Sequence, residues 1–334
     1  LRVRADNIGV GEGFHLNFIR DICTDGKGMV WACGLNGLAR FSGAAFKQYY
    51  EADSIHQTGL GQGGFLALDL DAEQHLWTAG PSGVYCYDEV RDSFCLTASP
   101  GAEGWKPMPR LIAFSPDKKH LWMLDTEGLW QKNMPHGVWE HLPLPKAPKP
   151  EMLLVTRSGR LFFSVEDYSV LYDPVRQTVL SVCHGALYAF EAPDGAIYFG
   201  TWRRGLRRID PHHFTEEVYF PPGDYQLGVY GEVFQGLGMA PAITDGNLLW
   251  CCTLDSGIWF FDTQKKKFVH HLDWDEKGAS GLPDFAAGPM YVDRGGVAWL
   301  AMSGITRIAP HRQQLLSQKV YGLKAQDARE FTVR

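Results

Sequence analysis

The residues best suited to recognise a ligand lie in one short corner, Trp202-Arg203-Arg204. An indole can stack on a sugar face, and a guanidinium can hold a carboxylate through two hydrogen bonds. Tyr225 and Tyr230 follow in a long segment that we expect to leave on the same side. Together these groups would suit an acidic oligosaccharide. A solvated arginine pair beside a packing tryptophan is the structural alternative.

Two other arginines and one aspartate complete the candidate ligand contacts. Arg20 and Arg110 each begin a short apolar strand at aligned positions. Either guanidinium could point into an axial channel as a ligand contact, or could form a salt bridge there. Asp255 occupies, in a later part of the chain, the corner position that Trp202 and Arg203 occupy earlier.

Motifs for catalysis and cofactor binding are lacking in the sequence. The string GLGQGG at 59–64 satisfies the dinucleotide glycine pattern, but that fingerprint must follow a strand and open a helix. Here it precedes an apolar strand at 65–70, so we interpret it as a loop. The adjacent histidine pairs at 212–213 and 270–271 are poor chelates, because consecutive strand residues point to opposite faces. We expect no catalytic residue, metal or cofactor, although distant carboxylates could still meet as an acid–base pair.

Composition and charge argue against some classes of partner. The 334 residues carry 32 Lys and Arg against 38 Asp and Glu, a net charge of −6, whereas nucleic-acid binding needs clustered cations. No run approaches the roughly 18 apolar residues of a membrane span, so we expect no membrane insertion by this segment. The chain begins at Leu1 without a signal-peptide pattern, which suggests a mature chain or a section of one. The seven cysteines lack a regular spacing and are interpreted as buried thiols, with a Cys86–Cys95 hairpin pair as the alternative.

A repeat of about 45 residues runs through the chain. Segment 18–49 contains four short apolar runs separated by Asp-Gly and Gly-bounded turns, which is typical of hairpins. The aromatic residue of the second run recurs seven times, at steps of 46, 45, 40, 36, 52 and 49 residues. These aromatics are Trp31, Trp77, Trp122, Phe162, Tyr198, Trp250 and Trp299. A small residue followed by an apolar one opens each third run, and an aspartate often closes it.

Four strands of this length make one propeller blade. A single twisted sheet cannot bury both faces, so such units must stack face to face in a ring. We predict an all-β fold: a single seven-bladed β-propeller domain over 1–334, built from four-stranded antiparallel blades. The second-strand aromatics are expected to fill the wedges between blades, and the recurrent aspartates to cap turns. The predicted blades span approximately 18–50, 65–97, 108–142, 151–180, 187–220, 239–272 and 285–320.

Departures from the repeat are also informative. The fourth unit is the most degenerate, with Phe162 in place of Trp and Ser169 in place of Gly. The link at 221–238 is the longest, and long links are often functional. The ring could be closed by either of two short strand-like ends, 1–5 or 329–334, and the tail also looks like the beginning of a further unit.

Two segments, DGKGMVWACGLNGLARF at 25–41 and DGAIYFGTWRRGLRRID at 194–210, resemble the two-component regulator propeller repeat. Segments 245–262 and 294–308 match it more loosely. The resemblance implies the periplasmic sensor region of a hybrid two-component histidine kinase/response regulator from a Gram-negative gut bacterium, anchored in the inner membrane and responding to glycan breakdown products. It also implies that the neighbouring sensor domains or a dimer mate are partners, and that any kinase lies elsewhere in the parent protein.

The leading hypothesis is therefore a non-enzymatic periplasmic sensor that binds an oligosaccharide. A propeller enzyme, either streptogramin-lyase-like or a polysaccharide lyase, is the alternative. It would need clustered histidines and carboxylates at one mouth of the ring, usually with a divalent metal. A scaffold that binds only proteins is the third possibility.

Overall fold

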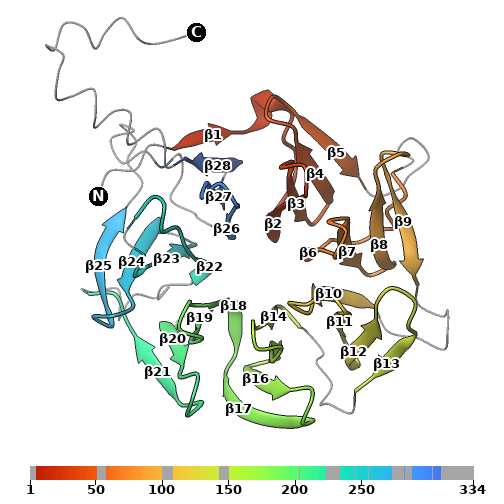
Figure 1. Ribbon diagram of the computed structural model, residues 1–334. Coiled ribbons are helices and arrows are strands. Elements are labelled where there is room, and N and C mark those ends of the chain that lie inside the picture. The colour runs from red at the N-terminus through yellow and green to blue at the C-terminus, as the bar shows by residue number, and fades with distance from the viewer. Residues whose placement is uncertain are drawn as a thin grey trace, which may run out of the picture.

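Seven four-stranded antiparallel sheets form a closed ring in the computed structural model (Figure 1). This confirms the prediction of an all-β, seven-bladed propeller. The described residues are 5–50, 58–99, 108–142, 150–202, 204–222, 234–244, 246–254, 256–272, 282, 288–302 and 304–309. Within them the only helical element is the 3-10 turn η1 (Val10–Glu12), and no helix has the length and apolar character needed to cross a membrane.

In blades 1 to 6, the strands follow the chain from the axis outward (Figure 1). Blade 1 contains β2 (Asp21–Thr24), β3 (Val30–Gly34), β4 (Gly37–Phe41) and β5 (Phe46–Tyr50); blade 2 contains β6 (Ala67–Leu70), β7 (Leu76–Gly80), β8 (Gly83–Asp88) and β9 (Ser93–Ala98). Blade 3 contains β10 (Pro109–Phe114), β11 (His120–Asp125), β12 (Gly128–Asn133) and β13 (Trp139–His141); blade 4 contains β14 (Leu153–Val155), β15 (Leu161–Val165), β16 (Tyr168–Asp173) and β17 (Thr178–His184). Blade 5 contains β18 (Ala186–Glu191), β19 (Ile197–Thr201), β20 (Leu206–Ile209) and β21 (Glu216–Tyr219); blade 6 contains β22 (Phe234–Met239), β23 (Leu248–Thr253), β24 (Ile258–Asp262) and β25 (Lys267–Leu272).

Blade 7 combines both ends of the described chain. Its inner strands are β26 (Met290–Val292), β27 (Ala298–Ala301) and β28 (Ile305–Ile308), and its outermost strand is β1 (Asp6–Ile8). Asp6 pairs with Arg307 in the ladder, and the Arg307 guanidinium donates to the Asp6 carboxylate at 3.0 Å. The ring is therefore closed from the N-terminal side, but by residues 6–8 and not by the predicted segment 1–5, of which 1–4 lie outside the described residues. The alternative segment, 329–334, lies outside the described residues.

The second-strand aromatics fill the wedges between blades, as predicted. Trp31 is fully buried and meets Tyr87 and Phe94 of blade 2 edge-on, with ring centroids 4.8 and 6.0 Å apart. Phe162 packs on Phe199 of blade 5 in a tilted arrangement, with ring centroids 5.2 Å apart. All seven aromatics are buried. Burial of such rings contributes about 2–3 kcal/mol each and is the main attraction between neighbouring sheets.

The aspartates that close third strands cap the turns that follow, which confirms that prediction: one oxygen of each accepts two backbone N–H groups, at Asp88, Asp173, Asp210 and Asp262. A second set of aspartates, in turns between first and second strands, also holds three of the wedge tryptophans. One oxygen of Asp25 accepts two backbone N–H groups of its turn, while the other accepts the indole N–H of Trp31 at 2.9 Å. This indole bond was not predicted, although the six-residue spacing can be read from the sequence. The same bond joins Trp77 to Asp71 and Trp299 to Asp293.

The topology gives the ring two distinct faces. The turns that join first to second and third to fourth strands lie on one face, here called the turn face. The corners that join second to third strands lie on the other, the linker face, together with the links between blades. Gly37, at such a corner, has a φ of +130°, and a Cβ there would collide with the carbonyl oxygen of Tyr49. Glycine at this position is thus required by the backbone.

Candidate functional site

The link between blades 4 and 5 is a single residue. β17 ends at His184 and β18 begins at Ala186, so only Gly185 crosses from the outer edge of one blade to the axial strand of the next. Between blades 1 and 2, by contrast, residues 51–66 separate the corresponding strands. All other links between successive blades are also longer. Little chain is consequently available to cover the linker face between blades 4 and 5.

Two serines of blade 4 hold the links on either side of it. The N–H of Ala186 donates to Ser169 Oγ at 2.8 Å, which fixes the one-residue link. Ser164 Oγ accepts the N–H groups of Glu151 and Met152 at 2.8 and 3.0 Å, which fixes the preceding link. Ser169 occupies the position of the usual corner glycine. The replacement of the corner glycine by Ser169 in blade 4 therefore has a structural role, since it holds the short link.

A hollow of about 650 Å³ lies on the linker face between blades 4 and 5. We call it the rim hollow. Its volume is within the range of small-ligand sites. Trp202, which is not one of the seven repeat aromatics, lines it with 54% of its surface exposed, whereas all seven of those are buried. The polar and aromatic groups that can contact a ligand are Glu151, Glu166, Asp167, His184, Trp202 and Arg204.

The charges of the rim hollow have no partners within the described part of the chain. The carboxylates of Glu151, Glu166 and Asp167 form no hydrogen bond or ion pair there, and neither does the guanidinium of Arg204. Three carboxylates against one guanidinium favour a ligand rich in hydroxyl or ammonium donors. The described lining thus favours a neutral or amino sugar over the acidic one suggested by the sequence.

His184 closes one side of the rim hollow. Its Nδ1 lies 3.1 Å from Glu216 Oε1 and 2.9 Å from Arg207 Nη1, while Arg207 also donates to Glu216. In one tautomer Nδ1 donates to Glu216, and in the other it accepts from Arg207. Nδ1 is therefore hydrogen-bonded within the protein in both tautomers. Nε2 is the ring nitrogen that remains for a ligand.

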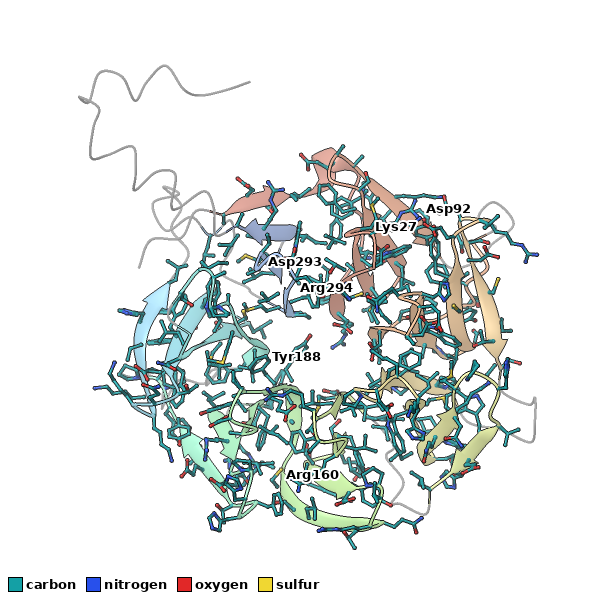
Figure 2. All side chains as sticks on the ribbon, viewed as in Figure 1. Lys27, Asp92, Arg160, Tyr188, Asp293 and Arg294 are labelled. Carbon is teal, nitrogen blue, oxygen red and sulfur yellow. The ribbon has the colours of Figure 1, made fainter. Side chains whose placement is uncertain are left out.

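A second hollow, of about 270 Å³, follows the axis between the inner strands of blades 1 to 5; we call it the axial hollow. Arg20 lines it, and its guanidinium has no salt-bridge partner among the described residues. Tyr188 of β18 lies at the inner edge of the ring (Figure 2) and also lines this hollow. Glu151 and Leu187 line both hollows, so the rim hollow adjoins the axis. A ligand longer than one sugar unit could extend between them.

Carboxylates at the axis join neighbouring blades. Asp21 accepts the N–H of Leu68 in blade 2 at 2.9 Å, and Asp69 accepts the N–H of Phe114 in blade 3 at 2.7 Å. Burial raises the pKa of Asp21 to about 7. The sequence analysis did not identify these contacts, because they join residues of different repeats. They give the two aspartates a structural role beside the axial hollow.

Of the remaining predicted site residues, Arg110 is the one that the structure describes. Arg110 lines neither the rim hollow nor the axial hollow, but a smaller one where blades 1 to 3 meet. Arg203, Tyr225, Tyr230 and Asp255 lie outside the described residues.

One group in the described part of the chain could hold a metal ion: Asp71, Glu73 and His75. It lies on the turn face, away from both hollows. Asp71 already accepts the indole N–H of Trp77 at 2.9 Å and the backbone N–H of His75 at 2.8 Å. These bonds give it a capping role without any metal.

The chain shares its fold with solved structures, although no match is found by sequence. No known family profile matches the chain, and no curated protein matches it in sequence. Among solved structures, it is similar to the extracellular domain assigned to the hybrid two-component system BT3049 of B. thetaiotaomicron, with a TM-score of 0.73 and 19% identity over 92% of this chain. The extracellular domain of BT4673 from the same organism gives a TM-score of 0.68 at 15% identity over 91% of this chain. The chain thus has the propeller fold of these extracellular domains, as the repeat resemblance implied.

The likeness has two limits that bear on function. The chain spans about two fifths of the length of these neighbours, 42% of the BT3049 domain and 39% of the BT4673 domain. Virginiamycin B lyase from Staphylococcus aureus also shares the fold, with a TM-score of 0.60 and 12% identity over 92% of this chain and 99% of the lyase. Fold alone does not separate a sensor from a lyase.

Proposed function

We propose that this chain is a ligand-binding propeller of a periplasmic sensor, and that it binds a neutral or amino-bearing oligosaccharide without catalysing a reaction on it. The observation that carries the proposal is the exposed Trp202 beside carboxylates without partners in the rim hollow. The fold shared with extracellular domains of two-component systems supports the sensor role and the location outside the cytoplasmic membrane.

The rim hollow offers each kind of contact that sugar binding requires. Trp202 supplies a flat apolar face for the C–H surface of a pyranose ring. Glu166 and Asp167 accept hydrogen bonds from hydroxyl or ammonium groups, and Arg204 donates them. The adjoining axial hollow would accommodate a further unit of the same ligand.

A signal has to leave this domain through a partner. The BT3049 and BT4673 domains are more than twice as long as the part that this chain matches, which supports a neighbouring sensor domain or a dimer mate as that partner. A ligand bound on the linker face would lie at the surface where the links and corners of the blades meet, and could alter contacts made there.

The test is calorimetric titration of the chain with neutral, amino-bearing and acidic oligosaccharides of equal length. We expect the amino-bearing and neutral sugars to bind, and Trp202→Ala to weaken binding at least about tenfold through loss of the stacking face. Val90→Ala, at an exposed site on the turn face, should leave the affinity unchanged. Failure of every sugar to bind would overturn the proposal and favour a protein-binding scaffold.

The lyase alternative deserves a direct assay because the fold similarity covers nearly the whole S. aureus enzyme. A solved lyase neighbour is a catalytically inactive variant with quinupristin, which names the substrate to try. Incubation of the chain with quinupristin and Mg²⁺, followed by mass spectrometry, should leave the compound intact. A cleaved product would overturn the non-enzymatic proposal.

A further inference from the structure

Three arginines of the described chain lack any hydrogen bond, ion pair or ring contact for the guanidinium: Arg20, Arg110 and Arg204. Arg20 and Arg204 line the axial and rim hollows. Arg110 lines a third, separate hollow. An unpartnered cation in each hollow is unusual, because the other described arginines are paired with carboxylates, amides or aromatic rings.

The third hollow has a volume of about 180 Å³ and lies on the linker face where blades 1, 2 and 3 meet. Leu35 and Pro81 approach from the corners of blades 1 and 2, and Leu66 and Met108 from the two links between these blades. Its described lining is apolar except for Arg110 and the Thr126 hydroxyl, and contains no carboxylate. The rim hollow, with three carboxylates, has the opposite character.

The local backbone explains how Arg110 comes to face this hollow. Pro109 pairs with Asp125 and Leu111 with Leu124, so Arg110 is the extra residue of a β-bulge in β10. Bulges redirect side chains and are frequent beside binding sites. The Nε of Arg110 is buried without an acceptor, and such a group carries a desolvation cost until an acceptor arrives.

We propose that this hollow binds a small monocarboxylate with an apolar body. The carboxylate lies on the Arg110 guanidinium, and the body packs against Leu35 and Leu66. A guanidinium–carboxylate pair is charge-assisted and directional, which makes Arg110 the specificity-determining group. The volume corresponds to about six water molecules, so an acid of about six carbons fits it. This site lies in other blades than the rim hollow and does not depend on the proposed oligosaccharide.

The test compares hexanoate with hexan-1-ol and hexylamine by calorimetric titration of the whole chain at pH 7.5. Hexanoate should bind, whereas the alcohol and the amine should not. Each methylene removed from the acid, down to acetate, should weaken binding about fourfold, as burial of a CH₂ predicts. Arg110→Gln should weaken hexanoate binding at least about tenfold.

Two further variants keep the test decisive. Arg204→Gln removes an equally unpartnered guanidinium from the rim hollow, and should leave hexanoate binding unchanged. Arg110→Lys keeps the charge and should restore part of the affinity, even if Arg110→Gln fails to fold. Equal binding of hexanoate and hexan-1-ol, unchanged binding in Arg110→Gln, or no binding by any of these acids at millimolar concentration would overturn the proposal. Sugar titrations report on the rim hollow, so the two proposals fail separately.

Discussion

The junction of blades 1 and 2 and the junction of blades 4 and 5 are built from the same repeat. The rim of the first is filled by its long link, apart from the hollow beside Arg110, whereas the second is open. At the first, the link between the blades folds over the corner of blade 2: Gly61 donates to the Tyr85 hydroxyl at 3.0 Å, and Ser82 donates to the Gln62 carbonyl at 2.8 Å. At the second, Gly185 alone makes the link, and a hollow of about 650 Å³ remains. The length of chain crossing the rim thus decides how much of a junction is packed, since the hollow beside the long link, next to Arg110, has only about 180 Å³.

Charged groups follow the same division. At the filled junction Arg40 lies over the rings of Trp31 and Tyr87, at 5.4 and 5.7 Å, and pairs with Asp92 at 3.2 Å. Asp92 lies toward the outside of the ring between blades 1 and 2 (Figure 2). At the open junction the carboxylates of Glu166 and Asp167 have no described partner. Charges at the first junction stabilise the fold, whereas Glu166, Asp167 and Arg204 at the second are available to a ligand.

Removal of the two tryptophans provides the largest test of this contrast. Trp31→Ala should lower the free energy of unfolding by about 4 kcal/mol, because a fully buried ring leaves a cavity between two blades. Trp202→Ala should change it by no more than about 0.5 kcal/mol, because half of the indole is already in water. Urea denaturation measures both. Equal losses in the two variants would show that the rim hollow is part of the packed core.

The pH dependence of the filled junction provides the next test, through Asp21. Between pH 3.8, the ordinary pKa, and about pH 7, the folded protein keeps a proton on Asp21 that the unfolded chain has released. The free energy of unfolding should therefore fall as pH rises through this window, by at most about 1.4 kcal/mol per pH unit, with no further loss above it. Asp21→Asn should flatten this slope in denaturation series from pH 4 to 8. Asp167→Asn, in the open junction, should retain it; an unchanged slope in Asp21→Asn would contradict the assignment.

A smaller effect is expected at Asp92. Its partial burial opposes ionisation, but hydrogen bonds from Lys47, Tyr49 and Tyr87 prevail and hold its pKa well below the ordinary 3.8. A lowered pKa adds stability above the unfolded value, and this stability is lost as the pH falls below about 4. Asp92→Asn should cost about 1 kcal/mol at pH 7, allowing for solvent screening of a partly exposed group. Thermal melts at pH 7 and pH 3 measure it: a cost that stays the same at pH 3 would refute the electrostatic origin.

The smallest effect on stability should come from the open junction itself. The double change Glu166→Gln with Asp167→Asn should alter the free energy of unfolding by less than about 0.5 kcal/mol, because neither exposed carboxylate has a described partner. It should instead reduce the preference for amino-bearing over acidic sugars, which titration measures. A large loss of stability with unchanged sugar preference would show that these carboxylates hold the fold.

The sequence was sufficient to predict the ring of blades, because the contact that fills each wedge recurs in every repeat. The aromatic spacing predicted the number of blades, and the recurrent aspartates predicted the turn caps. The open junction had a signal too: the step of 36 residues from Phe162 to Tyr198 is the shortest of the six, so the intervening link had to be short. The substitution of Ser169 for glycine was interpreted only as degeneracy, although it anchors that link.

Other features could not be read from a single repeat. The bulge that turns Arg110 toward its hollow depends on how β10 pairs with β11, and the sequence does not reveal that register. The contact of Asp21 with the N–H of Leu68 requires the distance between two blades. Trp202 and Arg204 were proposed from the sequence because an indole and a guanidinium at one corner suit a sugar ligand, and both line the rim hollow; their role in binding stays a prediction.

The pairing of β1 with β28 has a consequence for the order of folding. Its side-chain bond joins residues 301 positions apart in the chain, a loop closure with a high entropic cost. During synthesis the first strand has to wait, unpaired, until the last blade has been made. Completion of the ring is then a late, slow step that locks all seven sheets together, and until it occurs β28 presents an open edge to other chains.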